Sequence, residues 1–430
     1  MRVVDQSLSA YLRRFHGQHM VLDLSINEAP AFQRDKPYLL YIHIPFCESL
    51  CPFCSFHRVL FKEQKAHRYF AALNREIHNY HSQGLNVAEV YVGGGTPTVM
   101  PRQLSAMLQQ IRQMWGEVPI SVETNPNHLH DHYLAYLDEA GVNRLSVGVQ
   151  SFDNRLLKAM GRYQSYGSGE QIRQRLQQVS GRFDTLNVDM IFNIPHQDEA
   201  SLLQDLQWVV DAPIDQVSYY PLMPATTTQH AMSKQMGEVN FEREREYFQL
   251  IQDTLEPQYQ PTSVWCFARN QGAIDEYIVN HDEYIGAGSG AISYVNGGIY
   301  SSTFSLNNYI DLIAAGGTGL TARRQLNGKE QAQYDFLMRL FGLRMDKQQM
   351  QDKYDGEYFK LIRKEKWLFQ LLGALRDRGK YLELTREGRY FWLVMMREFF
   401  MGVNNFRCEM RAQIRAERDR IPELNVAGLN

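Results

Sequence analysis

The sequence has few cysteines and no long hydrophobic run. Its 430 residues include five cysteines, an odd and small number that argues against a disulfide framework and fits a reducing compartment. The longest apolar runs, such as "FWLVMM", are far shorter than the ~20 residues that a helix needs to cross a bilayer. No apolar stretch near the first residue resembles a signal peptide. We therefore expect a cytoplasmic protein without a membrane span.

The chain also lacks a strong excess of charge of either sign. Its formal net charge is −3, with 22% charged and 44% hydrophobic residues. Such a chain has no overall field to attract nucleic acid or an anionic membrane. The composition is that of an average soluble globular protein, and the length is sufficient for two or three domains. We therefore expect no nucleic-acid partner.

Three of the cysteines stand close together. The stretch "YIHIPFCESLCPFCSF" contains Cys47, Cys51 and Cys54 with the spacing C-x3-C-x2-C. They could be three buried thiols, or part of a zinc site with His43 or His57 as a fourth ligand. An iron–sulfur cluster is the third and favoured interpretation. A cluster held by three thiolates keeps one iron without a protein ligand, and that iron can bind another molecule.

A glycine-rich turn follows the next strand-like segment. In "AEVYVGGGTPTVM" the strand runs into Gly93, Gly94 and Gly95. Glycines allow a ligand to approach the backbone where a Cβ would intrude. Such a turn would also suit a phosphate, but it has neither the lysine of a P-loop nor the spacing of a Rossmann fingerprint. Beside the cysteine cluster, it favours a ligand bound at the open iron.

Strand-like and helix-like segments alternate along the first half of the chain. Six apolar, β-rich runs are "YLLYIHIP", "AEVYVGGG", "PISVETNP", "NRLSVGVQS", "TLNVDMIFNIP" and "DQVSYYPLMP". This alternation predicts an α/β fold with a parallel sheet and helical crossovers, and it does not decide whether the sheet closes. Glu123, Gln150 and Asp189 follow the carboxyl ends of successive strands. That edge of a parallel sheet carries the ligand in known folds.

These motifs together resemble the radical S-adenosylmethionine (SAM) superfamily. More narrowly, the chain resembles the oxygen-independent coproporphyrinogen III oxidase family, which also includes heme chaperones, heme-degrading enzymes and class C radical SAM methylases. The matching motifs are "YIHIPFCESLCPFC", "VYVGGGTPT", "SVETNP", "RLSVGVQSF" followed by "MGR", "NVDMIFNIP" and "YIGAGSGAIS". They occur in that order over about residues 38 to 300.

The resemblance implies an architecture. It predicts a partial (β/α)6 TIM-like barrel with a helical, winged-helix-like C-terminal domain. The implied segments are an N-terminal extension at 1–37, the radical SAM core barrel at 38–224, a core extension of the coproporphyrinogen oxidase type at 225–327, and the helical C-terminal domain at 328–430. The piece "KYLELTREGRYFW" is typical of a β-wing followed by a helix.

The resemblance also implies cofactors and partners. Cys47, Cys51 and Cys54 would hold a [4Fe–4S] cluster whose open iron chelates the amino and carboxylate groups of SAM. One electron would cleave SAM to methionine and a 5′-deoxyadenosyl radical, which takes hydrogen from the substrate. A flavodoxin- or ferredoxin-type protein would supply the electron. The substrate would be a small hydrophobic molecule, and the chain would be an oxidoreductase or a methyltransferase.

Individual residues match positions at which the family binds SAM. Contacts to the first SAM map to Tyr41, Gly94 and Glu123, and Phe53 falls where a side chain packs near the nucleotide. Contacts to a second SAM map to Gly95, Thr96, Gln150, Arg162, Asp189 and Ile292, with Met223 as a weaker match. Carboxylates can pair with ammonium, sulfonium or ribose hydroxyl groups, and an arginine can hold a carboxylate through two hydrogen bonds. A second SAM would suit a second reaction step or methyl transfer.

The sequence departs from its relatives at several points. Ser55 and Phe56 follow Cys54 where the oxidases have a further cysteine, and the oxidases' N-terminal arm is not evident in residues 1–37. The heme chaperones' H-N-x-x-Y-W motif is replaced by "IDEYIVNHDEYIGAG", which has no tryptophan. The reaction therefore stays open between oxidation, methylation and other tetrapyrrole chemistry. The alternative is a chaperone-like protein that binds heme without radical turnover.

Other segments give simpler expectations. We expect the charge run "FEREREYFQLIQDTL" to be a solvated helix face, Cys266 to be a buried structural thiol, and His43 and His57 to be structural rather than proton-transfer groups or heme ligands. The segment "YFWLVMMREFFMGVNNFR" is either a buried helix or an apolar wall of a substrate site.

Overall fold

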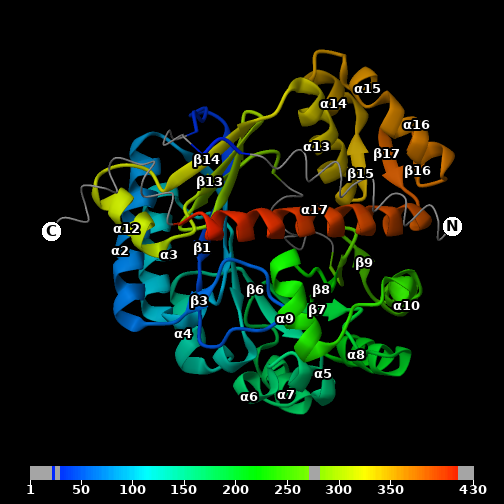
Figure 1. Ribbon diagram of the computed structural model, residues 1–430, viewed down its shortest axis with the longest axis horizontal. Helices are drawn as coiled ribbons and strands as arrows, with labels where there is room; N and C mark the ends of the chain where they lie inside the picture. Colours follow the sequence, from blue (N-terminus) through cyan, green and yellow to red (C-terminus); the bar gives the residue numbers. More distant parts are fainter. Residues whose placement is uncertain (1–21, 25–29, 271–280, 415–430) are drawn as a thin grey trace.

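A twelve-stranded sheet forms the centre of the molecule (Figure 1). The computed structural model describes residues 22–24, 30–270 and 281–414. The strand order is β14-β13-β12-β11-β1-β4-β5-β6-β7-β8-β10-β9. The parallel strands of the barrel are β1 (Pro37–Ile44), β4 (Asn86–Gly94), β5 (Ile120–Thr124), β6 (Arg144–Gln150), β7 (Thr185–Phe192) and β8 (Gln216–Pro221). They coincide with the six strand-like runs of the sequence, so the predicted α/β fold with a parallel sheet is confirmed.

Helices connect these strands and cover one face of the sheet. They are α2 (Glu63–Ser82), α3 (Pro101–Trp115), α4 (Asp131–Glu139), α5 (Asn154–Ala159), α6 (Tyr163–Tyr166), α7 (Gly169–Val179) and α8 (Glu199–Asp211). Their apolar residues recur at helical spacing, as the buried Leu104, Met107, Leu108 and Ile111 of α3 show. This spacing places the apolar side chains on the helix face that packs against the sheet.

The sheet does not close into a full barrel. Beyond β8, the sheet continues with β10 (Cys266–Ala268) and β9 (Gln260–Pro261), which are antiparallel. At the other end, β11 (Tyr284–Ala287) lies parallel to β1. Three antiparallel strands complete that end, namely β12 (Ile292–Val295), β13 (Gly298–Ser302) and β14 (Leu320–Gln325). Helix α12 (Leu306–Ala314) lies between β13 and β14 in the chain and packs against α2.

Because β14 and β9 end the sheet, the barrel is partial, a point that the strand pattern alone did not decide. Cys266 in β10 is buried, as expected for a structural thiol. Part of the segment that replaces the chaperone motif, residues 271–280, lies outside the described residues. In the described part of the chain, no helix combines the length and apolarity needed to span a membrane.

The C-terminal part combines helices with a small sheet. The helices are α13 (Gly328–Phe341), α14 (Lys347–Lys353), α15 (Tyr358–Leu361), α16 (Arg363–Leu371) and α17 (Arg386–Ala412). The sheet has the order β15-β17-β16, with β15 (Arg344–Asp346), β16 (Leu375–Arg378) and β17 (Tyr381–Leu384). The hairpin of β16 and β17 stands between α16 and α17, which is the arrangement of a wing. Helix α13 begins where the sequence suggested a domain boundary.

The last helix, α17, lies across the barrel in Figure 1 and joins the two parts. Its first half is buried, and the indole Nε1 of Trp392 donates to the carbonyl of Leu337 at 3.1 Å. Arg397 forms a buried ion pair with Glu244, the first residue of α10 (Glu244–Leu255), and with Glu398 at 2.8 Å.

The expectation that the charge run is only a solvated face is therefore wrong at Glu244. This side chain is fully buried, and a carboxylate inside the protein needs a charged or hydrogen-bonding partner. Arg397 supplies that partner from a helix about 150 residues further along the chain. Glu242 and Glu246 of the run are exposed as expected, whereas Arg243 and Arg245 are half-buried.

Candidate functional site

The cysteine-containing loop begins directly after β1. The short strands β2 (Phe46–Cys47) and β3 (Val59–Leu60) pair in parallel at the two ends of this loop. Within it, Arg58 donates from Nη2 to the carbonyl oxygens of Cys51 at 2.5 Å and Cys54 at 2.6 Å. A single guanidinium therefore holds the loop in a compact turn between two of the three cysteines.

The loop and the barrel enclose a cavity of about 260 Å³. All sequence-predicted residues except Thr96 and Ile292 line it, namely Tyr41, Cys47, Cys51, Phe53, Cys54, Gly94, Gly95, Glu123, Gln150, Arg162, Asp189 and Met223. These residues come from β1, β4, β5, β6 and β7, from the segments directly after β4 and β8, from the cysteine loop and, for Arg162, from the turn between α5 and α6. The fold thus brings residues as far apart in the sequence as Tyr41 and Met223 to one chamber.

Thr96 and Ile292 occupy positions beside this chamber. The hydroxyl of Thr96 lies 3.7 Å from the sulfur of Cys47 and accepts a 2.7 Å hydrogen bond from Asn125, a residue that lines the cavity. Ile292 lines a second cavity of about 70 Å³. Both cavities are lined by Tyr41, Phe400 and Arg407, so the two are neighbours.

Two glycines at the end of β4 allow the cysteine loop to approach. Gly94 has φ +126°, and a Cβ there would stand 2.8 Å from the carbonyl oxygen of Ile44. At Gly95, a Cβ would lie 2.7 Å from the carbonyl oxygen of Phe46 and 2.9 Å from the sulfur of Cys47. Any larger residue would displace the loop that carries the thiols. The glycine run is therefore required by the packing of the loop as well as by the ligand that the sequence suggested.

Glu123 forms part of an acidic end of the cavity. Its carboxylate accepts hydrogen bonds from the backbone N–H of Gly94 at 3.1 Å and from the hydroxyl of Tyr91 at 3.0 Å. Burial, together with the nearby charge of Asp189, raises the pKa of Glu123 to about 7. The group can therefore hold or release a proton near neutral pH, or pair with a cation that enters the cavity.

Asp189 lines the cavity from β7. It is not at the end of β7 but inside the strand, level with Gly148 of β6 and Ser218 of β8. Its oxygens accept hydrogen bonds from Ser146 at 2.8 Å and Asn187 at 2.9 Å. Burial raises the pKa of this carboxyl group, an effect that nearby Arg144 opposes.

Arg162 also contacts the cysteine loop. Its Nη2 donates to Asn125 at 3.0 Å and to the carbonyl of Gly148 at 2.5 Å, while Nη1 stands 3.4 Å from the sulfur of Cys51. The guanidinium also lies over the ring of Tyr166, 4.1 Å from its centre. These contacts give Arg162 a supporting role that the sequence did not reveal, beside the ligand contact that the resemblance implied.

Gln150 has an unusual backbone conformation. It is a non-glycine residue with φ +76°, and it lies where the register between β6 and β7 shifts. Such positive φ values are uncommon and tend to occur at functional sites. The shift places Gln150 on the lining of the cavity, as predicted for a ligand contact.

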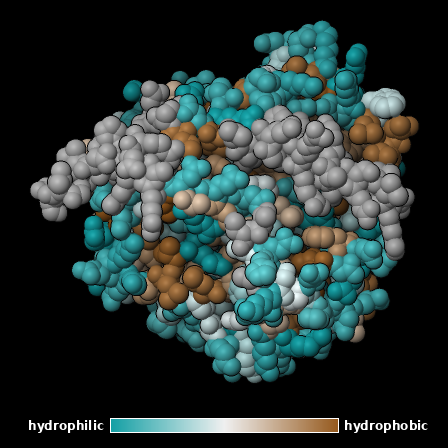
Figure 2. All heavy atoms as spheres, in the orientation of Figure 1, coloured by the Kyte–Doolittle hydropathy of each residue, from teal (hydrophilic) through white to brown (hydrophobic). Residues whose placement is uncertain are grey.

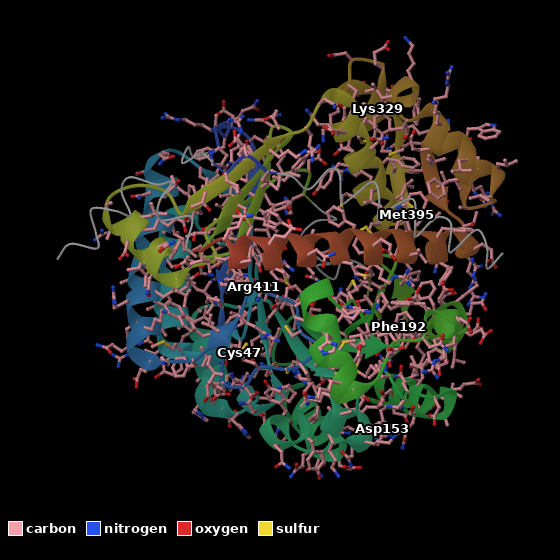
Figure 3. All side chains as sticks on the ribbon, in the orientation of Figure 1. Cys47, Asp153, Phe192, Lys329, Met395 and Arg411 are labelled. Atoms are coloured by element: carbon pink, nitrogen blue, oxygen red, sulfur yellow. The ribbon has the colours of Figure 1, made fainter. Side chains whose placement is uncertain are left out.

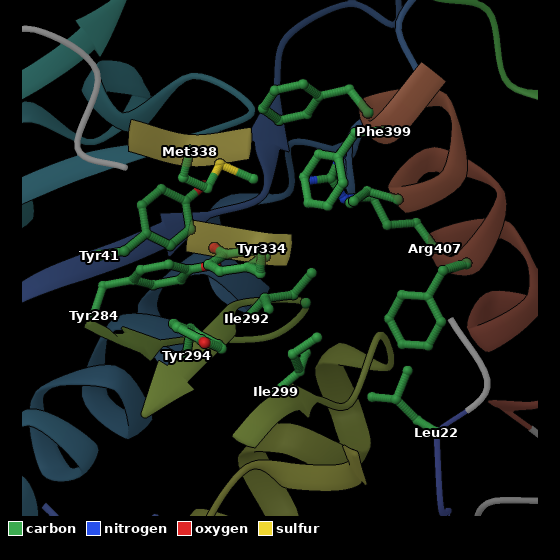
Figure 4. Close-up of a pocket in the computed structure, with 14 residues that line it drawn as sticks. Leu22, Tyr41, Tyr284, Ile292, Tyr294, Ile299, Tyr334, Met338, Phe399 and Arg407 are labelled. Atoms are coloured by element: carbon green, nitrogen blue, oxygen red, sulfur yellow. The ribbon is translucent and has the colours of Figure 1, made fainter. Parts of the chain in front are cut away.

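The smaller cavity is rich in aromatic side chains. Figure 4 shows Tyr41, Tyr284, Tyr294 and Tyr334 on one side and Phe399 on α17 on the other. Apolar residues complete the lining, namely Leu22, Ile292, Ile299, Met338, Phe400, Val403 and Phe406. Gly290 and Arg407 also line it. The first half of helix α17 is thus buried, as one interpretation of its sequence predicted, and its second half lines both cavities.

The second half of α17 also contacts the cysteine loop. Arg411 reaches the carbonyl of Ser55 at 3.5 Å, and the guanidinium of Arg407 lies 4.9 Å from the ring centre of Phe56. Asn404 donates to the carbonyl of Met223 at 3.3 Å. Figure 3 shows the end of α17 with Arg411 close to the ribbon that carries Cys47.

The two histidines near the cysteines have structural partners. His43 is hydrogen-bonded through Nδ1 to the hydroxyl of Tyr41 and through Nε2 to the carbonyl of His57, both at 2.9 Å. Burial lowers the pKa of His43 to about 4, so its ring is neutral. His57 is hydrogen-bonded to Ser289 at 3.1 Å. These contacts fit the structural interpretation of both residues.

The donor set fits an iron–sulfur cluster. Burial, and to a smaller extent the nearby Cys54, raises the pKa of Cys47 to about 12. The thiolate form of Cys47 is therefore stable only beside a strong positive charge such as that of iron. Both ring nitrogens of His43 are engaged by the protein, which removes it as the fourth ligand of a zinc site. Among the described residues, no three His, Cys, Asp or Glu side chains gather as around one metal ion. Thiolates that hold different irons of a cluster need not converge in that way.

Several residues of the site could not be found from the sequence. Arg58 follows Cys54 by four positions, but that spacing alone carries no signal. Asn125 lies within the motif "SVETNP" and Tyr166 ends α6, but neither residue was assigned to the site from the sequence. Arg407 lies more than 350 residues after the cysteines and reaches the cavity only because α17 folds back over the barrel.

Comparison with known proteins agrees with this geometry. The model of the Radical SAM superfamily matches residues 41–209. The heme chaperone HemW of Bacillus subtilis (strain 168) is 27% identical over 332 residues, covering 73% of this chain and 86% of the relative. The oxygen-independent coproporphyrinogen III oxidase of Salmonella typhimurium is 25% identical over 401 residues, covering 85% of this chain and 86% of the relative.

The fold also resembles that of a solved protein structure. The solved structure of coproporphyrinogen III oxidase (HemN) from Escherichia coli has a TM-score of 0.74 at 24% identity, covering 85% of this chain and 91% of that chain. This likeness concerns the fold, while the family match and the two relatives concern the sequence. These matches support a radical SAM core over residues 41–209 in a chain that is similar to both the oxygen-independent coproporphyrinogen III oxidases and the HemW heme chaperones.

Proposed function

We propose that the chain is an enzyme that cleaves SAM reductively and acts on a hydrophobic substrate. Cys47, Cys51 and Cys54 would hold a [4Fe–4S] cluster, and SAM would bind in the 260 Å³ cavity. The observation that carries the proposal is that these thiols, the glycine edge and the acidic end line one cavity. When bound, the cluster supplies the electron for reductive cleavage of SAM and thus for hydrogen abstraction from the substrate.

The residues of the chain would divide the work of binding. Glu123 would accept hydrogen bonds from the ammonium or ribose groups of SAM, because its carboxylate lines the cavity beside the glycine edge. Phe53 would pack near the nucleotide. The aromatic chamber beside Tyr41 would take an apolar part of the substrate and exclude water from it. Helix α17 would cover both chambers and keep the reaction away from solvent.

The number of SAM molecules is part of the proposal. Of the residues assigned to a second SAM by resemblance, Thr96 and Arg162 contact cysteine sulfurs, which gives them a supporting role as well. Gln150 and Asp189 line the cavity from neighbouring strands and would carry more of the binding. A second SAM would allow methyl transfer or a second oxidation step. A flavodoxin- or ferredoxin-type protein in the cytoplasm would donate the electron.

A second candidate is a heme chaperone-like protein. The similarity to HemW of Bacillus subtilis, which extends over 86% of that protein, favours it. In this case the chain would bind heme stably and would not turn over a substrate. The two candidates predict different outcomes in the same anaerobic experiment.

The test is reconstitution with iron and sulfide, followed by dithionite and SAM. We expect 5′-deoxyadenosine and methionine by mass spectrometry, and none from a Cys47→Ala, Cys51→Ala, Cys54→Ala variant. S-adenosylhomocysteine would add methyl transfer to the activity. A fully loaded protein that gives no deoxyadenosine with porphyrinogens or other apolar candidates, and that binds heme with a stable absorbance spectrum, would refute the enzyme and support the chaperone.

A further inference from the structure

An apolar patch on α16 is exposed to solvent. Trp367, Leu368 and Leu371 are exposed by 63%, 41% and 68%. Leu371 is four residues after Trp367 and three after Leu368, and residues at these spacings are neighbours on a helix, so the three side chains form one surface. Figure 2 shows hydrophobic side chains at the edge of the molecule over α16. None of the three lines either cavity.

The fold does not need these side chains for its core. The inward face of α16 carries Phe369, which is buried and lies 4.8 Å from the ring of Trp392 and 6.3 Å from the ring of Phe336. That contact attaches the helix to α17 and α13. Trp367 and Leu371 are therefore not needed to attach the helix to the core. Large exposed apolar side chains that adjoin one another mark interaction sites.

Basic residues surround the patch. Arg363 and Lys364 precede it by one helical turn, and Arg376 and Arg378 are exposed on β16, which packs against α16. Within the described residues, none of these four cations forms an ion pair, whereas the nearby Lys347 is paired with Asp377 at 2.7 Å. A chain with a net charge of −3 thus presents a local surface of the opposite sign.

We propose that α16 and the wing form a docking surface for an anionic lipid bilayer. Trp367, Leu368 and Leu371 enter the interfacial region, where aromatic and aliphatic side chains bind favourably. The four cations of the rim contact the acidic headgroups. The surface is separate from the cavity, so this binding does not depend on the proposed chemistry. It brings an enzyme with an apolar chamber to the phase in which apolar substrates concentrate.

The size and chemistry of the patch favour lipid over other partners. The exposed apolar area is on the order of 300 Å², well below the ~800 Å² per partner that a stable protein interface buries. A few inserted side chains with a basic rim are sufficient for reversible membrane binding. In a DNA-binding winged helix, the helix before the wing reads base edges through polar side chains. Here Trp367, Leu368 and Leu371 occupy the outer face of that helix.

The experiment measures binding of the full chain, without cluster or SAM, to sedimented vesicles. One set contains phosphatidylglycerol and phosphatidylcholine, and the other contains phosphatidylcholine alone. We expect binding to the anionic set, weakened by salt, with a blue shift of tryptophan fluorescence. Trp367→Ser with Leu371→Ser should lower the affinity by roughly tenfold or more, and Arg376→Gln with Arg378→Gln by about 30-fold.

A matched control is Leu203→Ser, which removes a leucine exposed by 39% on α8 of the barrel and should leave binding unchanged. Equal unfolding temperatures of all variants would show that the fold is intact. Failure of the wild-type chain to bind anionic vesicles, or equal binding of all variants, would overturn the proposal.

Other occupants would give other results. A concentration-dependent dimer that disappears in the Trp367→Ser, Leu371→Ser variant, without vesicle binding, would show that the face joins two copies of the chain. Preferential binding of duplex DNA would assign it to nucleic acid. Shielding of Trp367 from acrylamide in the free chain, measured against Trp367→Phe, would show that another segment already covers it. Each of these results would refute a lipid surface.

Discussion

The buried ion pairs of Arg397 should hold α17 over the cavity, and Arg397→Met tests this directly. The guanidinium is 4% exposed and pairs with Glu244, which is completely buried, and with Glu398 at 2.8 Å. It also lies 4.5 Å from the ring centre of Phe241. Methionine preserves much of the side-chain volume but removes the positive charge. Two buried carboxylates then lose the guanidinium that pairs with them.

The expected loss is large for one substitution. Removing one partner of a buried ion pair typically costs about 3–5 kcal/mol, because the remaining charge stays buried and unpaired. That is a substantial part of the 5–15 kcal/mol by which folded domains are stable. Burial already raises the pKa of Glu244, so acid protonates this carboxyl and removes its charge. The loss caused by Arg397→Met should therefore be smaller at pH 5 than at pH 8.

The assay is urea unfolding of the cluster-free chain, followed by circular dichroism at both pH values. Hydrogen exchange of residues 399–411 should report the loosening of α17 near the cavity. The matched control is Arg389→Met on the same helix, which breaks a more exposed 2.7 Å pair with Glu256 and should cost less than about 1 kcal/mol. A triple variant with Glu244→Gln and Glu398→Gln should recover much of the loss. Equal losses for Arg397→Met and Arg389→Met, or no recovery in the triple variant, would refute the reasoning.

Three further predictions concern the core and the cysteine loop. Burial raises the pKa of Glu76 from 4.5 to about 7. The protonated side chain therefore contributes about 3 kcal/mol of stability, which is complete below pH 4.5 and is lost as the pH rises through 7. Glu76→Gln should flatten the dependence of the unfolding free energy on pH between 5 and 8. Gly95→Ala should lower the iron bound after anaerobic reconstitution several-fold, because the new Cβ would stand 2.7 Å from a backbone oxygen of β2, whereas Gly328→Ala, with nothing within 4 Å, should not. Arg58→Gln should likewise reduce iron retention and visible absorbance, because it removes the two hydrogen bonds to loop carbonyls, while Arg68→Gln on the exposed face of α2 should leave both unchanged. Unchanged iron content in either loop variant, or an unchanged pH profile for Glu76→Gln, would contradict the corresponding prediction.

The positions of individual residues show which features of the site a local sequence pattern can predict. Glu123 and Gln150 were expected at the ligand edge of the sheet, and both line the cavity. Asp189 lies inside β7, level with Gly148 of β6, and lines the same cavity. Glu244 was expected in solvent and is buried, because its partner Arg397 comes from a distant helix that the charge pattern does not include.

The sequence by itself determined the spacing of the three cysteines, the glycine run and the six strands with their helices. These features are local: they depend on the period of apolar residues and on backbone freedom over a few positions. Only the tertiary structure decided that the sheet stays open, that Arg58 and Arg162 brace the loop, and that α17 returns to wall the cavity. It alone also showed that Trp367 stays outside the core while Trp392 lies within it. The physical reason is that burial, pairing of charges and closure of a cavity depend on which distant segments pack together, and no local pattern contains that information.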